Sequence, residues 1–558
     1  MVRLDTRSAA DRARRNSDLF IWIFVSLVAL ILLERQRAPS TFFFDEWTFV
    51  LGRRTGTLDD FLAPHNGHLS VLPVIFYKIS LSVFGMNHYR PLRITGLFVH
   101  VLVATAVYRY VRARMGPAAG VCFGVAVLLL GSGWQNIFWP FQVGFMGSAL
   151  FGIEAWILIE RNDRRSDVLA AVALGASLAC GGLGIAVVIG AAARLVVVRA
   201  GARLLRIAAA PTGLYLVWFL SYGQRQGTSD NVRLLPKFVS DEAASSTAAL
   251  FGRGLTAGRI MVALLLVLAV GSVIHRRKLS PTITAPLVCV SANWVLVGYS
   301  RADLGDFAAS RYVYVGAVFI LLVVSDVIGP SRHRASLVLW PVLATLSIWG
   351  NWNVLHAGAA GLRESTSTTR SELRALEWIS SVNPAFQPDT SLMPQVNAGQ
   401  YLSAVRKFGS PAFSDDQVAR NDELTREATD RVSIGGLKVA PVAGAAFPAG
   451  GLSLMIADGS RLTPASGTCL LLTQPPTITE RKVEISAPAG SRYVIQPVDK
   501  PIAVRLRRYA DLVPNIANNT IAAGETDSLT IPQDAAPLQT WIVDIRSQGD
   551  MKLCNVSP

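Results

Sequence analysis

Long apolar runs dominate the chain before about residue 355. The first run, Leu19 to Leu33, follows several arginines and lacks a small-residue cleavage site, so it predicts an uncleaved first helix. Ten later runs are each long enough to cross, or nearly cross, a bilayer core of about 30 Å. They begin near Pro91, Pro117, Phe141, Asp167, Leu183, Ile207, Gly258, Pro281, Tyr312 and Ala335. The pattern predicts a membrane-embedded helical bundle, with about eleven transmembrane helices, over residues 1–355.

Basic residues cluster in alternate connections between these runs. The clusters are Arg109, Arg112 and Arg114; Arg161, Arg164 and Arg165; Arg199, Arg203 and Arg206; Arg276, Arg277 and Lys278; and Arg332 and Arg334. If the N-terminus is cytoplasmic, parity places every cluster in the cytoplasm, as the positive-inside rule requires. We therefore expect a multi-pass protein of the inner or plasma membrane whose C-terminal domain is extracytoplasmic.

Two apolar segments need a separate interpretation. The stretch from Asp167 to Val198 fits a hairpin of two short helices that turns at Gly181 and Gly182, because basic clusters flank both of its ends. The segment from His68 to Gly85 repeats apolar residues at helical spacing around Lys78. That spacing favours an amphipathic helix that lies in the membrane interface.

Composition and charge narrow the class of protein. The 558 residues are 51% hydrophobic and 16% charged, a balance that a soluble protein of ordinary composition does not have. The net charge of +15 comes largely from the clusters between apolar runs, which suits lipid head groups and topology. Since no surface combining basic and aromatic residues is evident, we expect no nucleic-acid partner.

The chain from residue 356 to 558 has the mixed polarity of a water-soluble domain. A helix is expected from Ser365 to Ser381. From about residue 433 short alternating segments follow, which predict an α+β domain that ends in a β-sandwich and could bind carbohydrate. Cys469 and Cys554 lie in this domain and could form a disulfide if it is exported, or remain free thiols.

The first outer loop, residues 34–90, holds the residues best suited to chemistry. Asp45 and Glu46 follow Phe42, Phe43 and Phe44 and precede Trp47. Carboxylates among aromatic residues lose hydration, which favours a raised pKa and a role as general base. The alternative is that the pair merely marks the end of the first helix.

The order of motifs resembles the GT-C superfamily of membrane glycosyltransferases, which use polyprenyl-phosphate-linked sugars. The resemblance covers roughly residues 18–355. It includes the acidic pair, the string from His65 to His68 before the interfacial helix, the helix from Pro91 to Val111, and the string from Trp134 to Phe145 in the second outer loop.

The resemblance implies an inverting transfer in which Asp45 or Glu46 acts as general base. The residues on the same side of the membrane suggest partners for the donor phosphate, namely Arg311, Arg301, His65 and His68. Candidates for sugar or acceptor binding are Trp134, Trp139, Gln142 and Asn66. A divalent cation (Mg, Mn or Ca) held by Asp45, Glu46 and His65 is a further hypothesis.

The expected activity is transfer of mannose or arabinofuranose from a polyprenyl phosphate to a cell-envelope glycan or glycolipid of a bacterium. The alternatives are a transporter or flippase for a lipid-linked sugar, and a scaffold that binds glycan without catalysis. A transporter is expected to show repeat symmetry or ionisable residues at the bilayer midplane, and neither is evident in the sequence.

Overall fold

The computed structural model describes residues 2–224, 230–276, 280–330, 336–434, 438–441, 454–456, 461–462, 470–473, 480–511, 519–536 and 540–556. The chain forms two compact units. Unit 1 contains residues 1–40, 48–84 and 89–363, and unit 2 contains residues 41–47, 85–88 and 364–558. The boundary near residue 363 lies close to the predicted one. The assignment of residues 41–47 and 85–88 to unit 2 was not foreseen, because it depends on contacts between segments distant in sequence.

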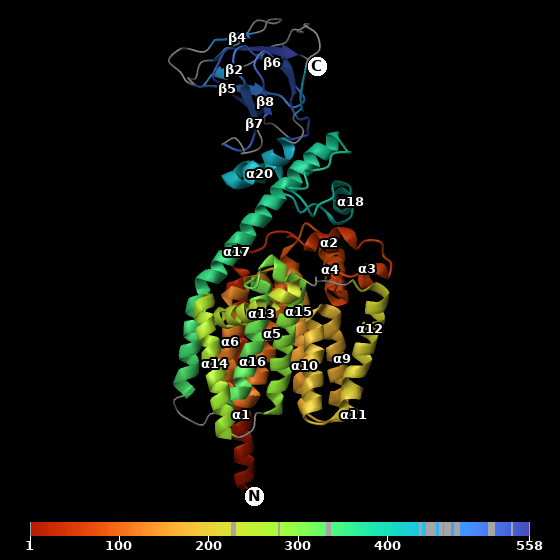
Figure 1. Ribbon diagram of the computed structural model, residues 1–558, viewed down its shortest axis with the longest axis vertical. Coiled ribbons are helices and arrows are strands. Elements are labelled where there is room, and N and C mark those ends of the chain that lie inside the picture. Colours follow the sequence, from red (N-terminus) through yellow and green to blue (C-terminus); the bar gives the residue numbers. More distant parts are fainter. Residues whose placement is uncertain are drawn as a thin grey trace. The chain divides into compact units, whose positions relative to one another are not determined.

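Unit 1 is a bundle of helices (Figure 1). Its helices are α1 (Val2–Glu34), α3 (Asp59–Leu62), α4 (Val71–Phe84), α5 (Arg90–Met115), α6 (Pro117–Leu128), α7 (Trp134–Phe138), α8 (Val143–Glu160), α9 (Arg164–Cys180), α10 (Leu183–Val197), α11 (Gly201–Leu204), α12 (Ala210–Tyr222), α13 (Asn231–Ala249), α14 (Leu255–Arg276), α15 (Thr284–Arg301) and α16 (Ser310–Ile328). Two helices, α2 (Glu46–Gly52) and α17 (Ser336–Val382), run from one unit into the other.

Seven helical segments among the described residues are long and apolar enough to cross a membrane, or eight if the bent pair α6 and α7 forms one span. The expected eleven spans are thus not confirmed. The runs near Asp167 and Leu183 form helices of only 17 and 15 residues. The run near Ala335 becomes the first part of α17, where Asn351 and Asn353 interrupt the apolar sequence.

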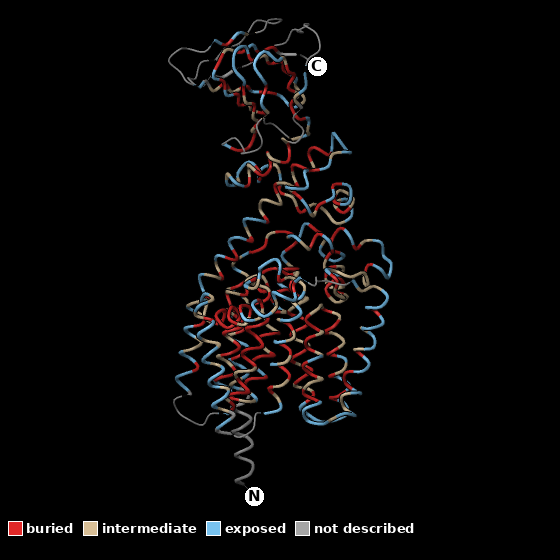
Figure 2. The backbone as a smooth tube through the Cα atoms, viewed as in Figure 1, coloured by how far each residue is buried: buried red, intermediate tan, exposed pale blue. Residues whose placement is uncertain are grey.

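Burial separates central from peripheral helices (Figure 2). In α16, 78% of the apolar segment is buried, whereas in α14 the share is 6%. Peripheral helices therefore expose large aliphatic side chains, among them Leu214 and Leu220 of α12 and Ile260 and Val267 of α14. An exposed apolar surface of this extent is typical of a protein that contacts a membrane or another protein there.

Both segments that needed a separate interpretation have the expected local structure. Helices α9 and α10 form a hairpin with Gly181 and Gly182 between them, and Gly181 adopts a φ of 159°. Helix α4 packs one side against the bundle through Val74, Tyr77 and Leu81. Its other side leaves Ile79 and Val83 58% and 64% exposed, as an amphipathic helix at an interface would.

Unit 2 combines helices with two antiparallel sheets. Its further helices are α18 (Ala398–Phe408), α19 (Asp415–Arg420) and α20 (Glu423–Ile434). The strands are β1 (Lys438–Pro441), β2 (Leu454–Ile456), β3 (Arg461–Leu462), β4 (Leu470–Leu472), β5 (Arg481–Ala487), β6 (Arg492–Pro497), β7 (Ile502–Arg507), β8 (Asn519–Ile521), β9 (Asp527–Thr530), β10 (Trp541–Ser547) and β11 (Met551–Val556). The predicted helix from Ser365 to Ser381 is the end of α17.

The two sheets pack face to face. One has the order β1-β9-β6-β11-β4 and the other β3-β2-β5-β10-β7-β8. A single apolar core joins residues of both sheets, for example Ile495 and Leu553 of the first with Val504 and Trp541 of the second. Since inward residues of both sheets share one core, this part is a β-sandwich, as the alternating pattern predicted.

Candidate functional site

The acidic pair lies at the start of α2, in the segment that belongs to unit 2. Glu46 is fully buried, and its Oε2 accepts a hydrogen bond of 2.7 Å from the backbone N–H of Phe43. Asp45 is half-buried. The next residue, Trp47, packs its ring edge-on against Tyr401 of α18, with 6.0 Å between ring centroids. Neither carboxylate stands in open solvent, and Asp45 is the more accessible of the two.

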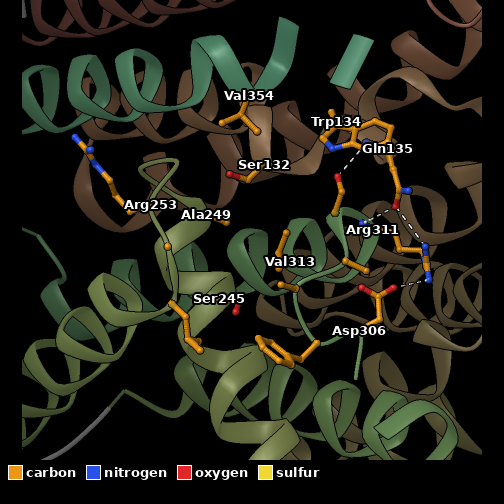
Figure 3. A pocket seen from close by; sticks show the side chains of 16 residues that line it. Ser132, Trp134, Gln135, Ser245, Ala249, Arg253, Asp306, Arg311, Val313 and Val354 are labelled. Atoms are coloured by element: carbon orange, nitrogen blue, oxygen red, sulfur yellow. Dashed lines mark hydrogen bonds and ion pairs between the residues drawn. The ribbon is translucent and has the colours of Figure 1, made fainter. Parts of the chain in front are cut away.

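Unit 1 contains a pocket of about 470 Å³ at the end of the bundle where α16 begins (Figure 3). Four elements supply its wall: the segment before and within α7, the face of α13, the turn before α14, and the loop that leads into α16. Val354 of α17 completes it. Of the residues predicted from sequence, Trp134 and Arg311 line this pocket.

Glycines bring these elements close together. A Cβ atom at Gly131 would lie 2.0 Å from the carbonyl oxygen of Asn351, and one at Gly133 would lie 2.5 Å from Cδ2 of Tyr314. Trp134 packs just as tightly on α17, because a Cβ atom at Gly358 would lie 2.3 Å from its Cγ. The start of the second predicted outer loop is thereby fixed against α16 and α17, which orients Trp134 at the pocket.

The pocket has an excess of positive charge. Arg311 contacts Asp306 at 3.3 Å, and its backbone N–H donates to Oε1 of Gln135 at 3.3 Å. The guanidinium of Arg311 itself donates to Oε1 of Gln135 at 3.5 Å, and this distance and that to Asp306 are long for a hydrogen bond from a charged donor, so the guanidinium can turn to a stronger acceptor. Arg253 is exposed and makes no ion pair among the described residues, although it lies 5.8 Å from the ring of Trp349. The pocket is lined by two arginines and one aspartate and lies beside the N-terminus of α16, where the helix dipole is positive. Both features favour an anionic ligand.

His65 and His68 form a second group, on a tight turn. Asn66 and Gly67 both have positive φ, 48° and 73°, and the two histidines exchange backbone hydrogen bonds of 2.9 and 3.0 Å across them. An Asn-Gly pair is the usual sequence for this turn. Asn66 is exposed, and its Nδ2 lies 3.2 Å from Nε2 of His65.

Both histidines are neutral at pH 7. Burial is the main cause that lowers the pKa of His65 to about 4, and the charges of Arg53 and Arg301 add to it. Burial and the charge of Arg301 also lower the pKa of His68. Arg301 therefore lies near the histidines, so the structure divides the predicted phosphate-binding residues: Arg301 belongs with the two histidines, and Arg311 belongs to the pocket.

Trp139 and Gln142 do not line the pocket. Both side chains are almost completely buried, and Trp139 stacks on Phe141 with 5.1 Å between centroids. Phe141 in turn contacts the ring of His65 at 5.2 Å. Their burial is that of core residues which support the histidine turn. It leaves no exposed ring face on Trp139 for a sugar.

Two charged residues that the sequence did not single out brace the first outer loop. Arg53 donates to the carbonyl oxygens of Asp60, Ala63 and Pro64 at 2.7–3.1 Å. The buried carboxylate of Asp60 accepts a 2.7 Å hydrogen bond from Lys78 of α4. Burial alone would raise the pKa of Asp60, but hydrogen bonds from Lys78 and Thr55 outweigh it and lower the pKa to about 2.

The metal and disulfide hypotheses have different outcomes. Within the part of the chain that the structure describes, no group of three or more His, Cys, Asp or Glu side chains is placed to hold a metal ion. The set of Asp45, Glu46 and His65 therefore has no support here. Cys554 is disulfide-bonded, whereas Cys469 lies outside the described residues.

Sequence reasoning missed three polar residues at or next to the pocket. Asp306 and Gln135 line it, and Glu242 lies on the face of α13 that reaches it. The three come from segments far apart in the sequence, so only the packing of α7, α13 and α16 reveals the association. The chain matches no protein-family model, and no curated protein matches it.

Proposed function

We propose that this chain is an inverting membrane glycosyltransferase that moves mannose or arabinofuranose from a polyprenyl phosphate to a cell-envelope glycan or glycolipid. The observation that carries the proposal is the pocket that Arg253, Arg311 and Trp134 line, with Arg253 and Arg311 on opposite sides of it in Figure 3. Arginines bind phosphate oxygens through paired hydrogen bonds, and a tryptophan ring suits the apolar face of a sugar. A lipid phosphate is also the leaving group of such a transfer, so cationic donors would stabilise the charge that develops on it.

Asp45 is our choice for the general base. A sugar hydroxyl is a weak nucleophile, and a carboxylate that removes its proton accelerates attack on the anomeric carbon. Asp45 is half-buried and accessible, whereas Glu46 is fully buried and engaged by the backbone N–H of Phe43. Glu46 therefore has a positioning role at the start of α2.

The membrane setting follows from the apolar helices. Exposed aliphatic side chains on α12 and α14 suit contact with lipid, and the exposed side of α4 suits the membrane interface. With the basic clusters in the cytoplasm, the outer loops that hold the pocket residues and the acidic pair are extracytoplasmic, as is the C-terminal sandwich. We assign the acceptor glycan to the sandwich.

The test is a transfer assay. Membranes that contain the wild type, Asp45→Asn or Glu46→Gln are incubated with a panel of polyprenyl-phosphate sugars, and new glycosidic products are measured. We expect Asp45→Asn to lose at least about a hundredfold in rate, the size of a general-base contribution. Glu46→Gln should lose less. Normal transfer by Asp45→Asn contradicts the assignment, and movement of sugar across vesicles without a new bond indicates a transporter.

A further inference from the structure

Glu242 of α13 is buried without a partner. None of its surface is exposed, and neither carboxyl oxygen has a hydrogen-bond partner among the described residues. The preceding residue differs, because Asp241 pairs with Lys237 at 2.8 Å and Arg259 at 2.7 Å. A buried carboxyl group without hydrogen bonds is destabilising, so its presence calls for an explanation.

Two further polar groups lie beside it without partners. Oγ of Ser246 and Nε1 of Trp294 are both buried and unpaired among the described residues. Ser246 follows Glu242 by one helical turn and lies on the same face of α13. A Cβ atom at Gly316 of α16 would lie 2.1 Å from Oγ of Ser246 and 3.2 Å from Nε1 of Trp294, so these two groups converge there.

The packing of α13 against α15 indicates that Glu242 lies close to Ser246 and Trp294. Phe238, one turn before Glu242, packs against Gly298 of α15, since a Cβ atom at Gly298 would lie 2.9 Å from its ring. Ser246, one turn after Glu242, lies near Trp294. Glu242 therefore lies on the stretch of α13 that packs on α15, between these two contacts. We call Glu242, Ser246 and Trp294 the inner cluster.

None of the three residues of the inner cluster lines the pocket, but the cluster lies one helical turn from it. Ser245 and Ala249 of α13 line the pocket, and they follow Glu242 by three and seven residues, which places them on its face of the helix. On α16, Val313 lines the pocket and Gly316 follows three residues later. Figure 3 shows Ser245 and Val313 on the pocket wall. At 1.5 Å per residue, three residues advance only about 4.5 Å along a helix axis.

The chemistry of the inner cluster is that of a neutral hydrogen-bonding site. Burial raises the pKa of Glu242 to about 9, so at pH 7 its carboxyl group can donate as well as accept. Ser246 does both, and Trp294 donates. None of the three is cationic, so the cluster suits hydroxyl groups rather than phosphate. The two arginines that suit phosphate lie at the pocket itself.

We propose that Glu242, Ser246 and Trp294 form an inner subsite of the pocket that binds hydroxyl groups of a neutral sugar, while Arg253 and Arg311 hold the phosphate. The inference rests on the proposed function, and it names the residues that would select the sugar. The unpaired groups of the inner cluster are then satisfied when ligand is bound, which explains why the empty protein retains them.

The test uses the full-length protein in lipid nanodiscs and follows its thermal unfolding. The neutral probes are methyl α-D-mannopyranoside and methyl α-D-arabinofuranoside, and the anionic probe is inorganic phosphate. We expect one of the glycosides to raise the unfolding temperature of the wild type. Glu242→Gln should keep most of this effect, because an amide also donates and accepts. Glu242→Leu should bind the glycoside at least tenfold more weakly and keep the response to phosphate.

Stability without ligand separates a binding role from a structural one. Replacing an unpaired buried carboxyl group by leucine should raise the unfolding temperature of the empty protein. If Glu242 instead supported the fold, Glu242→Leu would lower it. Arg311→Gln is the matched control, which should weaken the response to phosphate and keep the response to glycoside.

Three results would overturn the inference: no glycoside response in the wild type, an unchanged response in Glu242→Leu, or a lower unfolding temperature of Glu242→Leu without ligand. An unchanged response would mean that water alone fills the inner cluster. A protein that binds glycoside through Glu242 and transfers no sugar would support the subsite and contradict the proposed function, so the two failures are distinguishable.

Discussion

The ion pair between Asp60 and Lys78 should couple the first outer loop to α4. The carboxylate of Asp60 is 2% exposed and lies 2.7 Å from the ammonium of Lys78, which is 26% exposed. Removing one partner of a buried pair costs about 3–5 kcal/mol. Thr55 and Gly56 still donate to Asp60 when Lys78 is replaced, so we expect Lys78→Met to cost about 3 kcal/mol, at the lower end.

A double-mutant cycle isolates the pair. Asp60→Asn, Lys78→Met and the double variant are unfolded with denaturant in mixed micelles, and the coupling energy should be about 2 kcal/mol. The exposed pair of Arg420 and Asp416, 3.7 Å apart, is the matched control, and Arg420→Met should cost less than about 0.5 kcal/mol. A coupling energy between Asp60 and Lys78 no larger than the cost of Arg420→Met would refute the reasoning.

The pair also predicts a pH dependence. The folded-state pKa of Asp60 is about 2, below its ordinary value of 3.8. A depressed carboxyl pKa stabilises the folded state above the unfolded pKa, so this stabilisation is complete above about pH 4 and is lost as pH falls through 2. The Asp60→Asn variant should lack that part of the acid response.

Three further predictions concern the site. Arg311→Gln should weaken donor binding about 10- to 100-fold, the size of the contribution of a charged hydrogen bond to phosphate, and this should be measured as a higher KM for the donor. An unchanged KM would mean that the phosphate binds elsewhere. Arg253→Gln tests the second arginine in the same way. The pKa of His65 is about 4 in the folded state, below its ordinary value of 6.5, so the wild type should lose stability as the pH falls from 6.5 to 4. Thermal unfolding should show a smaller loss for His65→Phe over the same range. Equal losses would mean that His65 does not cause the pH dependence. Gly67→Ala should cost about 1 kcal/mol because its φ is 73°, and an unfolding titration that finds no cost would contradict the strain.

Local patterns predicted most of the elements. The hairpin around Gly181 and Gly182, the helix from Val71 to Phe84 and the longer strands of the sandwich each have a periodicity that neighbouring residues alone determine. The number of spans was less predictable. Apolar composition does not specify where a helix ends, and α9 and α10 are shorter than the apolar run that contains them.

The site was predictable only in part. Trp134 and Arg311 could be found because aromatic and basic residues stand out at the ends of apolar runs. Glu242 could not, because its burial depends on how α13 packs against α15 and α16. The placement of the acidic pair in unit 2 likewise depends on contacts between residues 41–47 and the helices that begin some 350 residues later.

The most direct measurement is an electron cryo-microscopy structure of the wild type in nanodiscs with a bound polyprenyl-phosphate sugar. Our account predicts the phosphate within about 3 Å of the guanidinium groups of Arg253 and Arg311, the usual hydrogen-bond distance. A donor bound away from this pocket would contradict it.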